Sequence, residues 1–91
     1  MKKVVNTSMA PQAIGPYSQA IKANGFLFVS GQIPLDPVSG QLAYGGIEVQ
    51  THQVLKNLSA ILAQEGLTFD HVVKTGVFLQ DMNDFAVVNK V

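Results

Sequence analysis

The sequence predicts an α+β domain in which a mixed β-sheet, beginning with an N-terminal hairpin, packs against two helices. Three observations lead to this class: a hairpin signal near residue 24, a helical stripe of apolar residues from residue 47, and an alternating segment at residues 72–80. These elements differ from one another and no repeat or linker separates them, so we expect one domain over residues 1–91.

The hairpin is predicted by Asn24-Gly25, which lies between two candidate strand segments at residues 19–23 and 26–29. Asn and Gly both accept positive φ angles, and a two-residue type I′ turn needs them at both positions. Val4 and Val5 indicate a further strand before the hairpin. The prolines and the glycine of residues 34–40 predict an irregular loop after it.

A long helix is predicted from residue 47 to about residue 65, because apolar or semi-apolar residues recur there at helical spacing. Gly66 follows as a residue that can end a helix in the left-handed conformation. We expect the helix to lie across one face of the sheet. Its apolar stripe comprises Ile47, Thr51, Val54, Leu55, Leu58, Ile61 and Leu62. Its wetter side comprises Glu48, His52, Gln53, Lys56 and Asn57.

The C-terminal part predicts a strand followed by a second helix. Residues 72–80 alternate in polarity, and the face expected toward the helix carries Val73, Thr75, Val77 and Leu79. Asp81 can cap the second helix through its carboxylate. Four residues then lie together at helical spacing: Met82, Phe85, Ala86 and Asn89.

The composition favours an oligomer and offers no electrostatic attraction to nucleic acid. A chain of 91 residues buries only roughly 60–65% of its unfolded surface, yet 47% of its residues are apolar and 13% are charged. An additional interface between subunits would bury this surplus. The formal net charge is zero, all six basic residues are lysines and they form no basic stripe, so binding to nucleic acid is not expected.

Other function classes lack their characteristic patterns. No apolar run approaches the roughly 18–20 residues that span a bilayer, and polar residues interrupt the N-terminus too early for a signal peptide, so we expect a soluble cytoplasmic protein. Cysteine is absent, and His52 and His71 are too far apart for a metal motif. Gly45-Gly46 belongs to no phosphate-binding motif. We therefore expect no metal.

Two stretches of turn-forming and small polar residues bracket the hairpin and indicate the wall of a small-molecule site. They read Gly15-Pro16-Tyr17-Ser18-Gln19-Ala20 and Ser30-Gly31-Gln32-Ile33-Pro34. Pro16 fixes its own φ, and Gly31 allows another group to approach the backbone closely where a strand ends.

Plain structural roles remain open for the candidate residues. Tyr17 can present its ring and hydroxyl to a substrate, or it can anchor the turn before it. Ser30 and Gly31 can bind a carboxylate or an imine-derived ligand, mainly through backbone groups, or they can simply end the strand. Asn89 can reach a pocket from the second helix, or it can make a hydrogen bond at the helix end or between subunits.

The order and spacing of these motifs resemble the Rid family, the reactive intermediate deaminases also called YjgF proteins. Besides the two stretches above, the resemblance is carried by Gln50-Thr51-His52-Gln53, Lys74-Thr75-Gly76-Val77-Phe78 and Asp81-Met82-Asn83-Asp84-Phe85 with Asn89. It extends over essentially the whole chain. Residues 1–91 are thus interpreted as a single Rid/YjgF-like domain that is incomplete at its C-terminus.

The resemblance implies a chorismate-mutase-like fold and a homotrimer with pockets between subunits. It also implies hydrolysis of reactive enamines or imines, such as 2-aminoacrylate, to 2-keto acids and ammonia without a cofactor. Small-molecule imines and 2-keto acids are the implied ligands. The substrate-binding residues carried over from the family are Tyr17, Ser30, Gly31 and Asn89.

The catalytic residues are left unassigned. In the family mechanism an arginine holds the substrate carboxylate and an acidic residue positions water, and both follow the second helix. The 91 residues contain no arginine, and lysine does not reproduce its planar bidentate grip. We therefore expect the full-length parent to be the deaminase and these 91 residues alone to be inactive. A non-catalytic ligand-binding or regulatory trimer is the alternative, and an RNA-acting protein is a third, weaker one.

Overall fold

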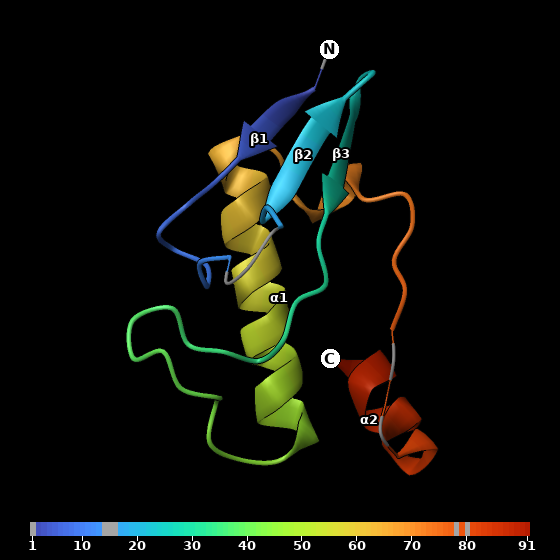
Figure 1. Cartoon of the computed structure of the whole chain (residues 1–91). Coiled ribbons are helices and arrows are strands. Elements are labelled where there is room, and N and C mark those ends of the chain that lie inside the picture. The colour runs from blue at the N-terminus through green and yellow to red at the C-terminus, as the bar shows by residue number, and fades with distance from the viewer. Residues whose placement is uncertain (1, 14–16, 78, 80) are drawn as a thin grey trace.

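A computed structural model describes residues 2–13, 17–77, 79 and 81–91, and it confirms the α+β class. Three antiparallel strands form a sheet in the order β1-β2-β3, and the long helix α1 lies across one face of it (Figure 1). The strands are β1 (Lys3–Val5), β2 (Ala20–Ala23) and β3 (Phe26–Val29). The helices are α1 (Ile47–Gln64), α2 (Phe85–Lys90) and the 3-10 turns η1 (Phe69–His71) and η2 (Met82–Asp84). None of these described helices is long and apolar enough to cross a membrane.

The predicted hairpin is confirmed. Asn24 and Gly25 have φ angles of 51° and 79°, the positive values that the type I′ turn requires, and Ala23 pairs with Phe26 across them. The strand suggested by Val4 and Val5 is confirmed as β1, which pairs with β2. The parallel pairing that would make the sheet mixed is absent from the described residues.

The strand register divides the sheet into an inner face toward α1 and an outer face. Val5, Ala20 and Val29 are paired in one row of the inner face, and Val5 and Ala20 pack in the core with Ile61 of α1. Next to this row, the ammonium groups of Lys3 and Lys22 lie 3.3 and 3.6 Å from the Glu65 carboxylate beyond the end of α1. The outer face carries Val4, Ile21, Ala23, Phe26 and Phe28.

Glycines flank helix α1 at both ends, and the one at its C-terminal end is the one that the sequence predicts. Gly45 has a φ of 139°, and a Cβ there would lie 2.9 Å from Val49, so only glycine fits before the helix. At the other end Gly66 has a φ of 70°, and the amides of Gly66 and Leu67 donate to the carbonyls of Ala63 and Leu62. These two hydrogen bonds together form the Schellman motif, so the predicted helix end is confirmed.

The predicted position of Asn57 on the wetter side of α1 is wrong. Its side chain is 0% exposed. The reason is that its carboxamide donates hydrogen bonds to backbone carbonyls in the loop after β3. These bonds replace the hydrogen bonds to water that an exposed carboxamide would make.

The predicted strand at residues 72–80 is also wrong for the residues that the structure describes. Residues 72–77 and 79 have no strand partner, while Phe78 and Gln80 lie outside the described residues. Val73, expected to face the helix, is 86% exposed, and Val77 is exposed as well. Alternation gives a segment two distinct faces, but a strand forms only where a neighbouring strand supplies hydrogen bonds.

The second helix and its cap are confirmed. The Asp81 carboxylate accepts a hydrogen bond from the Asn83 amide at 2.9 Å, and η2 leads directly into α2. Helix α2 lies beside the N-terminal half of α1 and away from the sheet (Figure 1). Met82 and Phe85, on the predicted stripe, are exposed.

The loop at residues 34–40 is irregular, as predicted, and its turn is held by Asp36. The Oδ1 atom of Asp36 accepts hydrogen bonds from the amides of Val38 and Ser39 at 2.8 and 3.2 Å. These two bonds favour the ionised carboxylate and lower the pKa of Asp36 below its ordinary value.

We expect this turn to loosen in acid. Because the pKa of Asp36 is lower in the folded chain than in the unfolded chain, its stabilising effect is complete above the unfolded pKa of about 3.9 and is lost as the pH falls through the folded pKa. Amide chemical shifts of Val38 and Ser39 should follow this titration. Asp36→Asn should remove the pH dependence at both amides, whereas Asp70→Asn should leave it intact.

Candidate functional site

Tyr17 and Gly31, two of the predicted site residues, line the same small hollow. One wall comes from the N-terminal loop and the segment before β2, and the other comes from the chain that follows β3. Among the residues that the structure describes, the lining comprises Pro11, Gln12, Tyr17, Gln19, Gly31, Gln32, Ile33 and Leu35. The volume is about 60 Å³, far below the roughly 300–1,000 Å³ of small-molecule pockets. The described residues around this hollow therefore do not by themselves enclose a small molecule.

The surfaces of Tyr17 and Gly31 remain accessible. Tyr17 is 52% exposed, so its ring can receive a further group. A Cβ at Gly31 would meet nothing within 4 Å, which means that packing within the chain does not require glycine there. The open space beside the Gly31 backbone is what a ligand or a neighbouring subunit would need.

Ser30 makes the contacts of a strand end. Its hydroxyl donates to the Ser18 carbonyl, and its amide donates to the Gln19 carbonyl at 3.0 Å. The hydroxyl proton is therefore engaged within the chain, while the oxygen can still accept a bond. Ser30 does not line the hollow itself.

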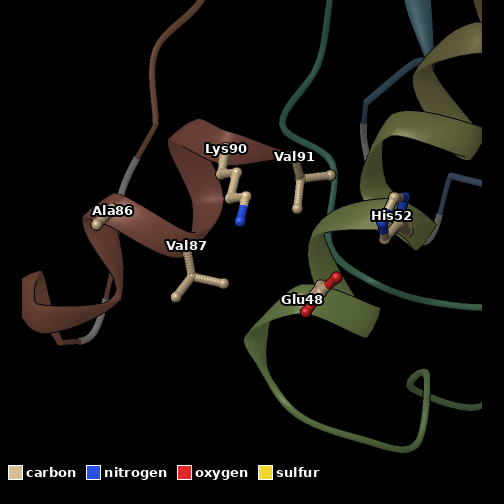
Figure 2. A pocket seen from close by; sticks show the side chains of 6 residues that line it. All are labelled: Glu48, His52, Ala86, Val87, Lys90 and Val91. Carbon is tan, nitrogen blue, oxygen red and sulfur yellow. The ribbon is translucent and has the colours of Figure 1, made fainter.

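Asn89 lies on α2 and lines neither of the two main hollows. A second hollow of about 510 Å³ separates α2 from the start of α1. Figure 2 shows Glu48 and His52 of α1 on one side of it and Val87, Lys90 and Val91 on the other. Within a single chain, Asn89 is thus not brought together with Tyr17 and Gly31.

Two buried carboxamides that the sequence did not single out hold the walls of the first hollow, and one of them, Gln19, also lines it. Gln19 is 2% exposed and Asn57 is 0% exposed, and both bond backbone groups of the hollow's walls. A signal for Asn57 was present, because it is three residues after Val54 and four before Ile61 on the apolar stripe. Gln19 has no comparable signal, since its partners lie 8 to 12 residues away.

The histidines make no metal site in the described part of the chain, where no group of three or more His, Cys, Asp or Glu residues could hold an ion. The His71 Nδ1 atom accepts a hydrogen bond from the Thr68 amide at 3.1 Å and closes the capping box of η1. His52 faces the second hollow from α1 (Figure 2).

Comparison with known proteins establishes the family. Residues 7–91 match the family profile described as Endoribonuclease L-PSP. A RutC family protein of Pyrococcus horikoshii is 55% identical over 91 residues, which are 100% of this chain and 72% of that protein. The 2-iminobutanoate/2-iminopropanoate deaminase of Mus musculus is 52% identical over 91 residues, which are 100% of this chain and 67% of the mouse protein.

Comparison with solved structures supports the same family. The Rid protein YyfA from Yersinia pestis superposes with a TM-score of 0.96 at 52% identity over 99% of this chain and 71% of that one. TdcF of E. coli with bound serine superposes with a TM-score of 0.91 at 39% identity over 97% of this chain and 68% of that one. The fold is that of a small α+β protein of the chorismate-mutase-like type. The chain belongs to the Rid family, also called YjgF.

Proposed function

We propose that this protein is an imine deaminase that hydrolyses 2-iminobutanoate, 2-iminopropanoate and related reactive intermediates. Water adds to the imine carbon, the carbon–nitrogen bond breaks, and the products are a 2-keto acid and ammonia. The observation that carries the proposal is the 52% identity with the mouse deaminase over all 91 residues. The hollow at Tyr17 and Gly31 supports the proposal, because it places the aromatic ring of Tyr17 in the same hollow as the accessible backbone of Gly31.

The substrate-binding residues that we propose are Tyr17, Ser30, Gly31 and Asn89. Tyr17 supplies a flat wall and a hydroxyl, Gly31 gives access to its backbone, and the Ser30 oxygen accepts a bond. Because the hollow is small and Asn89 is not on it, we propose that Asn89 meets the ligand in a pocket shared between subunits. Such fixed polar groups accelerate a reaction by orienting the substrate and by stabilising developing charge.

A homotrimer is part of the proposal. Its support is the outer face of the sheet, where Val4, Phe26 and Phe28 are exposed next to one another. The rings of Phe26 and Phe28 lie 6.2 Å apart, so they form one continuous apolar surface that another subunit can cover. We propose the cytoplasm as the compartment, since enamines released there by pyridoxal-phosphate enzymes would be its substrates.

The test measures ammonia release from freshly generated 2-iminopropanoate. The protein is purified from the cells that naturally produce it, and its intact mass is determined by mass spectrometry. We expect acceleration over the uncatalysed reaction. Tyr17→Ala should lower kcat/KM by about tenfold or more, because the ring orients the substrate. Tyr44 is completely exposed, so Tyr44→Ala is the matched control and should retain activity. Ammonia release no faster than in buffer would overturn the proposal.

A non-catalytic ligand-binding trimer is the second candidate, and the accessible Tyr17 ring and Gly31 backbone support ligand binding by either protein. Measuring both ligand binding and ammonia release distinguishes the binding protein from the deaminase. A binding protein retains 2-oxobutanoate with shifts at the Tyr17 and Gly31 amides but releases no ammonia. RNA binding, which the name of the matching profile raises, would instead weaken steeply with salt.

A further inference from the structure

We propose that Gln19 and Asn57 are positioning residues that hold the two walls of the Tyr17–Gly31 hollow at the separation the ligand needs. This inference rests on the proposed function, since the ligand is its imine substrate or 2-keto acid product. It assigns a role to two buried side chains that bond the backbone of the walls: Asn57 from outside the lining, and Gln19 from a position within the lining.

Gln19 anchors the first wall. Its Oε1 atom accepts a hydrogen bond from the Thr7 amide at 2.6 Å. Its Nε2 atom lies 3.0 Å from the Thr7 carbonyl, 3.2 Å from the Ala10 carbonyl and 2.7 Å from the Pro11 carbonyl. One buried carboxamide thus gathers the loop from Thr7 to Pro11, and Pro11 lines the hollow directly.

Asn57 anchors the second wall from α1. Its Nδ2 atom donates to the Leu35 carbonyl at 2.8 Å and lies 3.4 Å from the Ile33 carbonyl, and both residues line the hollow. Its Oδ1 atom accepts a bond from Gln53 Nε2 at 2.9 Å, one helical turn earlier. This second bond orients the carboxamide so that its N–H groups point toward the loop.

Both positions need a carboxamide. Each side chain donates to carbonyls and accepts from an N–H group, which a carboxylate cannot do because it only accepts. A carboxylate at either position would face carbonyl oxygens inside the protein and push the wall away. Since bound groups must be placed to within about 1 Å for efficient catalysis, a shifted wall should weaken substrate binding.

The experiment compares Gln19→Glu, Asn57→Asp and Asn57→Ala with two exposed controls on α1, Gln64→Glu and Ser59→Ala. Asn57→Ala removes the anchor without adding charge and with an excellent helix former, which protects folding. KM and kcat for 2-iminopropanoate are measured per folded molecule, with the folded fraction taken from thermal unfolding. We expect KM to rise about tenfold in the anchor variants and to stay constant in both controls.

A merely structural role would lower the folded fraction and leave KM unchanged, and that result would overturn the proposal. If the wild type releases no ammonia, the deaminase proposal fails and the positioning proposal is judged on 2-oxobutanoate binding, followed at the Tyr17 and Gly31 amides. A weaker Kd in the anchor variants then supports it. An unchanged Kd, or no binding by the wild type, overturns it.

Discussion

Replacing Ile61 with alanine should lower the free energy of unfolding by about 2–5 kcal/mol. Ile61 is 0% exposed and lies in the core cluster with Val5, Ala10 and Ala20, where α1 meets the sheet and the N-terminal loop. Alanine would leave a cavity between three segments that no other buried side chain fills. Domains of this size have only about 5–15 kcal/mol of net stability, so the variant should lose much of it.

Urea unfolding followed by circular dichroism measures this effect. Ile61→Val should cost only about 0.5–1.5 kcal/mol, since it removes a single methylene. Val38 is 94% exposed, so Val38→Ala should change the free energy of unfolding by less than about 0.5 kcal/mol. Equal midpoints for Ile61→Ala and Val38→Ala would show that the core does not lie between α1 and the sheet.

The elements that the sequence predicted correctly are those whose ends are encoded by neighbouring residues. Asn24-Gly25 supplies the two positive φ angles of the hairpin turn, and Gly66 supplies the one that ends α1. Asp81 likewise caps a helix that starts directly after it. In each case the partners lie within a few residues, so local chemistry determines the outcome.

The elements that the sequence misplaced depend on distant partners. The segment at residues 72–80 alternates in polarity as a strand does, yet its described residues have no neighbouring strand to bond. Asn57 is polar and was placed on the wet side, but carbonyls more than 20 residues earlier in the chain hold it in the interior. A helical wheel contains no information about that loop.

The candidate site likewise combines residues that could be predicted from local sequence with residues that could not. Tyr17 and Gly31 were predicted from their turn residues, and they line one hollow. Ser30 proved to be bonded within the hairpin end, and Asn89 lies on a helix that does not reach the hollow. Gly15 and Pro16, named with Tyr17 in the same stretch, lie outside the described residues. The site that we propose between subunits could not be assembled from the local pattern of one chain, because the distances between its parts would depend on the assembly.

Phe28→Glu should convert the proposed trimer into monomers and remove deaminase activity. Phe28 is 62% exposed in the single chain and lies on the outer face of the edge strand β3, paired with Ile21 and next to the Phe26 ring. Association through this face would bury a carboxylate from every subunit in an apolar surface, at a cost of several kcal/mol for each subunit. Because Asn89 and the Tyr17–Gly31 hollow are proposed to meet only across subunits, we expect activity to fall about 100-fold or more.

Light scattering after size-exclusion chromatography gives the mass of each variant, and ammonia release at several protein concentrations gives its activity. Phe69 is also an exposed phenylalanine, but it lies on η1 and on none of the strands that form the outer face, so Phe69→Glu controls for the added charge. It should keep both the trimer and its activity. A monomeric Phe28→Glu with full activity would confine the site to one chain, whereas an unchanged trimer would show that subunits associate through another surface.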